Sequence, residues 1–300
     1  MGYKYTEEEL KSFIAPLSRT EEERAENTER MIRNAIDSCD ELDDLKIEVF
    51  SQGSYANNTN VRRNSDVDIC VMLTSTFHAE YPDGYTRENY GFSPGTIDFY
   101  EYRNLVKKAL VDKFGANYIT DGNKSIKIHE NSYHVKADVV PAFQLRNYRS
   151  IKSTNPNKYV EGIWFEAKDN QIVSNYPKDH IQNGRNKNKS TSRKYKELVR
   201  IMKHIRNDMV DDGKCNRDSI SSFLIECLVW NIPNSLIIRY DSWQECTKKA
   251  ISYLYEHIKA GESKDWGEVS EHLYLFHNGR KWTREDVLRY LEAQWNYMGY

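Results

Sequence analysis

The stretch FSQGSYANNTNVRRNSDVDICVML, residues 50–73, decides the fold of this chain, because it places two aspartates inside an apolar run. Side chains two positions apart in an extended strand point to the same face, so Asp66 and Asp68 would project together, roughly 6–7 Å apart along the chain. Two ionised carboxylates repel each other and are costly when partly buried, unless a cation neutralises them. The pattern therefore predicts a divalent metal site.

A third carboxylate in similar surroundings is Asp138, within the segment VKADVVPAF. It is the only acid inside the second strong run of β-branched residues, a composition typical of a buried strand. Mg²⁺ prefers carboxylate and phosphate oxygens and keeps part of its water shell, so this site suits a bound polyphosphate. A third acid allows two ions, an arrangement typical of phosphoryl or nucleotidyl transfer.

The Gly-Ser pair upstream of the aspartates, Gly53 and Ser54, supplies a flexible backbone and a hydroxyl donor that can approach a phosphate. Taken alone, a Gly-Ser pair is usually a turn, and Asp-x-Asp alone is equally well a strand end with solvated acids. The combination of Gly-Ser, a short polar gap, Asp-x-Asp in an apolar strand and a lone Asp in a later strand is far more specific.

Composition limits the classes of partner. The chain has 300 residues, which suits one large or two ordinary domains. Its 43 Lys and Arg residues against 45 Asp and Glu residues give a net charge of −2, so a long DNA or RNA ligand is not required. The five cysteines are scattered without a CxxC pair, which disfavours a disulfide framework and a zinc ribbon. With neither a signal peptide nor a long apolar stretch, a soluble, cytoplasmic protein with no membrane partner is expected.

Periodicity divides the chain into an α/β first half and a helical second half, separated by the polar segment 178–190. Residues 6–37 are rich in Glu and Arg and predict a long, mostly solvated helix, kinked or broken near Pro16. Residues 97–114 have a helical period that ends at Gly115. The other expected elements are strands at 46–52 and 67–73, hairpins at 125–143 (turn at 130–132) and 162–177, and helices within 192–209, 219–233, 240–261 and 283–298.

These motifs resemble the GS…DxD signature of the DNA polymerase β-like nucleotidyltransferase superfamily, and ADVVPAF resembles its third-aspartate strand. Residues 175–207 and 219–233 are similar to segments of the bacterial CD-NTases, the cyclic GMP-AMP synthase and DncV-like enzymes of antiphage signalling, most of all to clade E. The resemblance covers nearly the whole chain. It implies an α+β fold: a polymerase β-like nucleotidyltransferase core with a mixed sheet and a long N-terminal helix over residues 1–178, and a C-terminal helical bundle domain over 179–300 that closes over the nucleotide pocket.

The resemblance also implies roles for single residues. In that family the positions that match Asp66, Asp68 and Asp138 bind two Mg²⁺ ions, for which Mn²⁺ can substitute. Asp138 would accept the proton of the attacking ribose hydroxyl, so no histidine base is needed.

Four further positions match residues that hold the donor triphosphate in the family: Gly53, Ser54, Lys196 and Ser222. Two of them have simpler interpretations. Lys196 lies in a basic stripe at helical spacing and can be one more solvated lysine. Ser222 can be a capping serine at a helix N-terminus, a role that is compatible with phosphate binding.

Asn175, in the segment SNYP, matches a region where an Asn goes with pyrimidine use in the resembling clade. Its amide can offer one donor and one acceptor to the Watson-Crick edge of uracil. The alternative is a turn residue before Tyr176 and Pro177.

The function expected from the resemblance is Mg²⁺-dependent synthesis of a cyclic dinucleotide or trinucleotide second messenger from NTPs, with pyrophosphate release, in antiphage (CBASS-type) signalling. A uridine-containing product such as cyclic UMP-AMP is expected, with a purine-only cyclic dinucleotide or extension of RNA as alternatives, and a non-catalytic nucleotide sensor as a third class. The expected partners are ATP, UTP or GTP and a downstream effector activated by the cyclic nucleotide. We expect a monomer without a DNA requirement, since the zinc ribbon of the animal synthases is absent.

Overall fold

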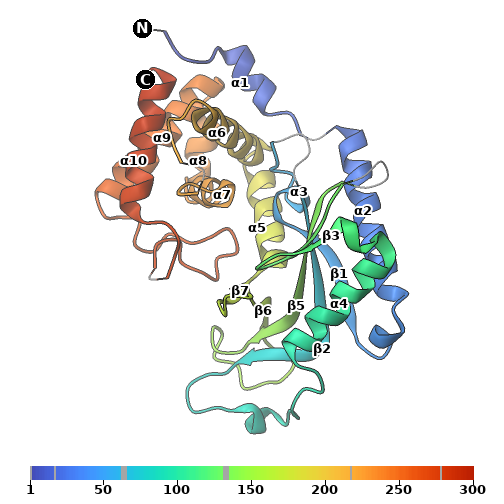
Figure 1. The fold of residues 1–300 in the computed structure, drawn as a ribbon. Coiled ribbons are helices and arrows are strands. Elements are labelled where there is room, and N and C mark those ends of the chain that lie inside the picture. The colour runs from blue at the N-terminus through green and yellow to red at the C-terminus, as the bar shows by residue number, and fades with distance from the viewer. Residues whose placement is uncertain (1, 17, 62–65, 131–134, 217, 278) are drawn as a thin grey trace. The chain divides into compact units, whose positions relative to one another are not determined.

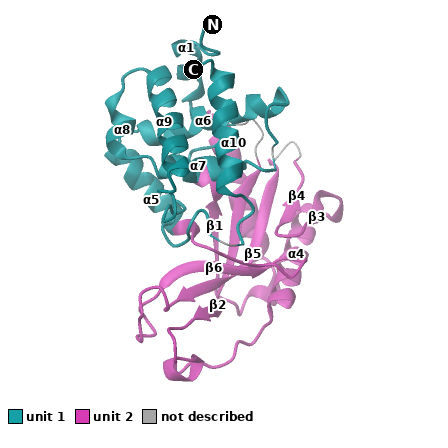
Figure 2. Cartoon of the chain, turned by 90° about the vertical axis from the view of Figure 1, so that its left-hand side faces the viewer, with its two compact units in different colours: residues 1–17, 57–62, 179–300 teal, residues 18–56, 63–178 magenta. Residues whose placement is uncertain are grey.

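The chain forms two compact units in the computed structural model, which describes residues 2–16, 18–61, 66–130, 135–216, 218–277 and 279–300 (Figure 1, Figure 2). The helical unit combines residues 1–17 and 57–62 with 179–300, and the sheet unit holds residues 18–56 and 63–178. The chain therefore leaves the sheet unit after residue 56 and returns to it at residue 63. The functional domains expected from the sequence, 1–178 and 179–300, stay a prediction, because a packing unit need not be a functional domain.

The sheet unit is built on two long parallel strands, β2 (Val67–Glu80) and β5 (Ala137–Asn147). Their first halves are buried at nearly every position, as expected of strands covered on both faces. Within the described residues the strand order is β1-β2-β5-β4-β3, β6 pairs with β5, and β7 pairs with β6. All pairs except β2 with β5 are antiparallel, so the sheet is mixed, as expected. The remaining strands are β1 (Ile47–Gln52), β3 (Ile119–Asp121), β4 (Ile126–Ile128), β6 (Val160–Glu166) and β7 (Ile172–Asn175).

Helices α2 (Arg19–Asp37) and α4 (Phe99–Phe114) pack against each other and against the sheet (Figure 1). Helix α4 begins at Asp98, whose side chain accepts a hydrogen bond from the Glu101 amide. It ends at Gly115, where φ is +88°, a value that glycine adopts most readily. The short helical segments of this unit are α3 (Gly53–Ala56) and the 3₁₀ helices η1 (Asp40–Leu42), η2 (Arg87–Tyr90) and η3 (Ala116–Tyr118).

The helical unit is arranged around α6 (Lys194–Asp211), which contacts α1, α7, α8, α9 and α10. Leu198, Met202 and Ile205, which the sequence places on one face, are fully buried there. Burial of each such side chain stabilises the unit by about 1.5–3 kcal/mol. None of the helices in the described ranges is long and apolar enough to cross a membrane. The other helices are α1 (Glu7–Phe13), α5 (Pro177–Ser190), α7 (Ser222–Trp230), α8 (Asn234–Arg239), α9 (Trp243–Lys259) and α10 (Arg284–Met298).

The helix expected over 6–37 is broken near Pro16 rather than kinked there. Proline lacks a backbone donor and favours a break. Each piece starts with its own capping box, at Thr6 for α1 and at Ser18 for α2. The two pieces belong to different units, and α2 is the long one, with 19 residues.

Two other elements differ from expectation. The polar segment 178–190 is helix α5, which carries almost no buried side chains and therefore lacks the apolar period by which helices are recognised. It begins with Pro177, a favoured residue at the first helical position. Strand β2 runs to Glu80, beyond the predicted end at 73. Both hairpins are confirmed by antiparallel pairing, while most of the predicted turn at 130–132 lies outside the described residues.

Candidate active site

Asp68 and Asp138 are register partners on the adjacent parallel strands β2 and β5. Each is the second residue of its strand, so both lie where the two strands begin. Partners on neighbouring strands are about 4.8 Å apart in the hydrogen-bonding direction. Ser125 donates a hydrogen bond of 3.0 Å from Oγ to Oδ1 of Asp138. The fold thus brings together two carboxylates that are 70 positions apart in the sequence.

The electrostatic surroundings of Asp68 are unfavourable for its charge. Burial raises the pKa of its carboxyl to about 7, and repulsion from Asp138 and Asp66 contributes in the same direction. The charged groups that act on its pKa are therefore other carboxylates. A cation at this position would offset both the burial and the repulsion.

Asp66 lies directly before β2 and is exposed, with the preceding residues 62–65 outside the described part of the chain. It is close enough to Asp68 to raise the pKa of that carboxyl. The three aspartates predicted from the sequence are thus gathered at the start of β2 and β5.

The donor set fits a hard divalent cation. In the described ranges, no group of three His, Cys, Asp or Glu side chains is arranged to hold a metal ion as it stands. Asp66, Asp68 and Asp138 nevertheless offer carboxylate oxygens, the ligands that Mg²⁺ prefers. None of the described charges that act on the pKa of the half-buried Asp68 is a cation. These are the residues that would hold such an ion.

Gly53 lies against the carboxylate of Asp68. It is the first residue of α3, directly after β1, and its φ is +69°. A Cβ atom built on Gly53 would lie 2.1 Å from Oδ2 of Asp68, which is impossible without movement of the carboxylate. Only glycine fits here, so the Gly-Ser pair brings backbone close to a predicted metal ligand. Ser54 follows as a half-buried residue of the same short helix.

Lys196 lies on α6 and is 8% exposed, so it is not a solvated lysine. Burial lowers the pKa of its ammonium group, and the charge of Glu226 partly opposes this effect. None of the described carboxylates forms an ion pair with it, which leaves its ammonium group available to an anion such as a phosphate.

Ser222 is the first residue of α7, but it is not the cap. The N-cap is Ser221, whose Oγ accepts a hydrogen bond of 3.1 Å from the Leu224 amide. The capping interpretation of Ser222 is therefore wrong by one residue, because two adjacent serines cannot be told apart by type alone.

Asn175 is the last residue of β7, paired with Ile163 of β6, and its side chain is exposed. It is therefore a strand residue rather than a turn residue. Gly162 allows this close approach, since a Cβ there would lie 2.7 Å from the Asn175 carbonyl oxygen.

The predicted site residues fall in both units. The structure gathers the three aspartates and Gly53 in the sheet unit, and places Ser54 next to Gly53. Asn175 belongs to the sheet unit, while Lys196 and Ser222 belong to the helical unit. The roles of all eight stay predictions. The sheet-unit members are Gly53, Ser54, Asp66, Asp68, Asp138 and Asn175.

Sequence reasoning missed Ser125, the partner of Asp138, and the buried pair of Lys203 and Glu226. A signal for the pair was present, because Glu226 is a lone acid in the apolar helix SFLIECLVW. Such an acid needs a buried cation, and Lys203 lies in the basic stripe of the preceding helix.

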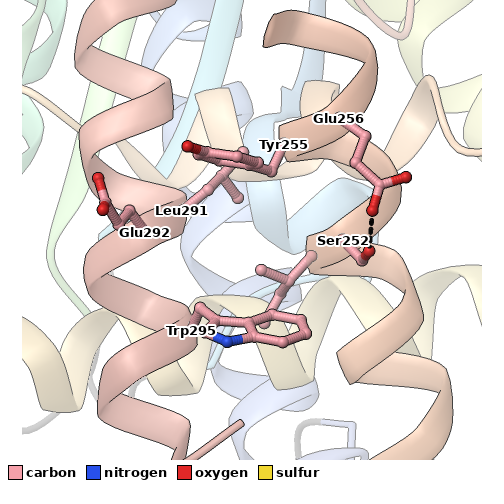
Figure 3. Close-up of a pocket in the computed structure, with 7 residues that line it drawn as sticks. Ser252, Tyr255, Glu256, Leu291, Glu292 and Trp295 are labelled. Atoms are coloured by element: carbon pink, nitrogen blue, oxygen red, sulfur yellow. Dashed lines mark hydrogen bonds between the residues drawn. The ribbon is translucent and has the colours of Figure 1, made fainter.

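A pocket of about 200 Å³ lies between α9 and α10 in the helical unit (Figure 3). Tyr255 and Trp295 face it from the two helices, and Ser252 donates a 2.6 Å hydrogen bond to Glu256 at its edge. The eight predicted site residues do not line this pocket, so it is separate from the candidate active site.

Comparison with known proteins gives matches over both halves. A nucleotidyltransferase domain model matches residues 32–165, and a model of the cGAS/DncV-like nucleotidyltransferase C-terminal helical domain matches residues 182–299. The cyclic dipyrimidine nucleotide synthase CdnE of Cecembia lonarensis is 46% identical over 296 residues, which cover 98% of this chain and 99% of that protein.

Two solved structures resemble the whole chain. The c-UMP-AMP synthase CdnE of Rhodothermus marinus, solved with Apcpp and Upnpp, has a TM-score of 0.86 and 29% identity, and covers 97% of this chain and 95% of its own. The CdnE cyclic dinucleotide synthase of Elizabethkingia meningoseptica, solved with GTP and Apcpp, has a TM-score of 0.83 and 32% identity, and covers 99% of this chain and 100% of its own.

Proposed function

Because the chain belongs to the cGAS/DncV-like nucleotidyltransferase family, we propose that it makes a cyclic dinucleotide or trinucleotide second messenger from NTPs, with release of pyrophosphate. The observation that carries the proposal is the gathering of three aspartates at the start of β2 and β5, where Gly53 lies against Asp68 and no described cation acts on the pKa of that carboxyl. The product would act in antiphage signalling of the CBASS type through an effector that the cyclic nucleotide activates. The enzyme would work as a monomer without DNA.

Binding of the donor NTP would use groups that are free to meet an anion. Gly53 and Ser54 supply backbone and a hydroxyl for the triphosphate. Lys196 supplies a buried ammonium group, and Ser222 a hydroxyl that the helix cap does not use. Hydrogen bonds from charged donors to phosphate are about twice as strong as those between neutral groups.

The chemical step transfers a nucleotidyl group to a ribose hydroxyl. Asp138 accepts the proton of that hydroxyl, and Ser125 holds the carboxylate in place through its hydrogen bond. The ribose oxygen then forms a bond to the α-phosphorus, and the bond from that phosphorus to pyrophosphate breaks. When bound to the three aspartates, two Mg²⁺ or Mn²⁺ ions would stabilise negative charge on the α-phosphate and on the leaving pyrophosphate. A second transfer of the same kind closes the ring.

For the product, a uridine-containing cyclic dinucleotide such as cyclic UMP-AMP has the best support. The Cecembia relative is named as a dipyrimidine synthase, and the Rhodothermus structure as a c-UMP-AMP synthase. Asn175 has an exposed amide that can pair with the edge of uracil. A purine-only product is the alternative, since the Elizabethkingia structure contains GTP and Apcpp.

The test is incorporation of labelled NTPs, one at a time, by the purified chain with Mg²⁺, with products resolved by mass spectrometry. We expect a phosphatase-resistant cyclic product that contains uridine and is lost in Asp66→Ala and Asp68→Ala. Synthesis that survives either substitution would overturn the mechanism. Lengthening of an added RNA primer, or nucleotide binding without turnover, would overturn the proposed function.

A further inference from the structure

We call residues 57–60 the crossing segment. They pack with the helical unit, whereas the chain before residue 57 and after residue 62 belongs to the sheet unit. Asn57, Thr59 and Asn60 of this segment are 1%, 0% and 4% exposed. Polar side chains are seldom buried to this degree without a defined set of partners. The amide of Asn60 has no hydrogen-bond partner among the described residues, so the partners of Asn57 and Thr59 indicate what the segment does.

Glu226 on α7 and Lys203 on α6 hold the crossing segment. Lys203 donates from Nζ to Oε2 of Glu226 at 2.7 Å and to the Thr59 hydroxyl at 3.0 Å. The same hydroxyl donates to Oε2 of Glu226 at 2.7 Å, and Nδ2 of Asn57 donates to Oε1 at 3.2 Å. One buried ion pair thus anchors two residues of the segment.

A further hydrogen bond from α6 and a glycine of α5 also contact the crossing segment. Arg200, on the same helix as Lys203, donates from Nη1 to the Asn58 carbonyl oxygen at 2.6 Å. Gly184 of α5 leaves room for Asn57, since a Cβ there would lie 3.4 Å from Oδ1 of Asn57. The segment is therefore fixed by contacts from α5, α6 and α7 of the helical unit.

The ion pair itself is fully desolvated, with Lys203 2% and Glu226 3% exposed. Two well-packed apolar side chains would join α6 to α7 at least as favourably as a buried ion pair does. What an apolar pair could not supply is the set of hydrogen bonds to Thr59 and Asn57. The polar pair is thus explained by its contacts with the crossing segment rather than by helix packing.

Spacing connects this pair to the proposed phosphate-binding residues. Glu226 lies four positions after Ser222, one turn along the same face of α7. Lys203 lies seven positions after Lys196, two turns along the same face of α6. The pair therefore sets the rotation of both helices about their axes.

We propose that Glu226, with Lys203, is a positioning residue for the donor triphosphate. It aligns the helix faces that carry Lys196 and Ser222, and it fixes the crossing segment, which follows α3 and its Gly53 and Ser54 directly in the chain. The proposal rests on the proposed function, because that function gives these residues their phosphate role.

The kinetic test removes the two hydrogen bonds of the Thr59 hydroxyl and keeps the ion pair. Thr59→Val preserves the shape of the side chain and loses its hydroxyl, while Thr59→Ser keeps the hydroxyl. The matched control is Tyr5→Phe, which removes a buried hydroxyl that donates to Asp208 of α6 at 2.7 Å. We expect kcat/KM for the NTP to fall about 100-fold in Thr59→Val, with a raised KM, because misplacement by about 1 Å has an effect of that size. Thr59→Ser and Tyr5→Phe should keep the wild-type kcat/KM.

A second measurement needs no catalysis. Amide hydrogen exchange of peptides that cover residues 50–60 should become about tenfold faster in Thr59→Val, from loss of bonds to the segment, and stay unchanged in Tyr5→Phe. A wild-type chain without nucleotide product would overturn the proposed function, while the exchange rates would still decide whether the pair holds the segment. Equal exchange and equal kcat/KM in Thr59→Val and Tyr5→Phe would overturn the positioning role.

Discussion

Two carboxylates, one in each unit, have pKa values shifted in opposite directions: the half-buried Asp68 and the buried Glu226. Burial raises the pKa of Asp68 to about 7, and two nearby carboxylates add to the rise. Burial also acts to raise the pKa of Glu226, but Lys203 and His180 hold it well below its ordinary value. The helical unit thus supplies a cation for its buried acid, whereas the described groups that act on the pKa of Asp68 in the sheet unit are further acids.

This difference is the one expected between an acid whose charge the fold satisfies and an acid that awaits a ligand. A compensated pair such as Glu226 and Lys203 needs nothing from outside the chain. A half-buried acid with no cation beside it among the described residues, such as Asp68, lowers stability. Such positions are concentrated at functional sites, where a ligand supplies what the fold does not. Four experiments test this difference between the two acids.

Asp138→Asn should lower the rate of pyrophosphate release from NTPs by about 10²- to 10⁴-fold, the usual contribution of a general base. The matched control is Asp121→Asn in β3, since Asp121 is already paired with Arg103 at 2.8 Å and Lys107 at 3.2 Å. It should keep the wild-type rate. Equal losses in the two variants, measured by a pyrophosphate assay, would show that the two kinds of aspartate do not differ.

Glu226→Gln should lower the free energy of unfolding by about 3–5 kcal/mol, because it leaves Lys203 as an uncompensated buried charge. The double variant Glu226→Leu with Lys203→Met removes both charges and should recover part of that stability, because it still leaves the buried Thr59 and Asn57 without Glu226 as a partner. Urea unfolding followed by circular dichroism measures both. A single variant as stable as the wild type would contradict the view that Glu226 compensates Lys203.

The stability of the metal-free protein should depend on pH through Asp68. Its pKa is about 7 in the folded chain against an ordinary 3.8, so between these values the folded state binds more protons than the unfolded state. Stability should therefore fall as the pH rises through this window. Glu226 acts in the opposite sense, since its stabilisation is lost as the pH falls below the ordinary carboxyl pKa.

Melting temperatures in EDTA at several pH values measure this effect. Asp68→Asn should remove the fall between pH 4 and 7 and raise the melting temperature at neutral pH. Added Mg²⁺ should stabilise the wild type more at neutral pH than at pH 5, because only the ionised carboxylate binds it. A wild-type profile identical to that of Asp68→Asn would exclude the raised pKa.

Asn175→Ser should have the smallest effect, a shift of up to about tenfold in the product ratio towards purines, the size expected for one hydrogen bond. The total rate should stay close to that of the wild type, because Asn175 lies outside the aspartate cluster. Mass spectrometry of products from equal concentrations of the four NTPs measures the ratio. An unchanged ratio would remove Asn175 from base selection.

The sequence predicted the parts of the site that depend on local geometry. Asp66 and Asp68 share a face because strand side chains alternate, and Asp138 stands out in its β-branched run. The register that pairs Asp68 with Asp138 is a long-range property of the sheet, and only the structure supplies it. Likewise, the contact of Gly53 with Asp68 explains why the residue before Ser54 is a glycine.

Other features had no local signal. Helix α5 is polar on nearly all sides, so it shows no apolar period in the sequence. The helix cap is Ser221 rather than Ser222, and residue type does not distinguish two adjacent serines. The crossing segment looks like an ordinary Asn-rich connection in the sequence. Its Thr59 is bonded to Glu226, which lies 167 positions further along the chain. Such pairs follow from the tertiary fold rather than from composition.

The most direct test of the central claim is calorimetric titration of Mn²⁺ into the wild-type chain and Asp68→Asn, each with a non-hydrolysable ATP analogue at neutral pH. The account predicts that the wild type binds the cation and that Asp68→Asn, although at least as stable without metal, has lost most of this binding. Equal affinity for Mn²⁺ in the two proteins would contradict the claim that the uncompensated carboxylates of the sheet unit form the cation site.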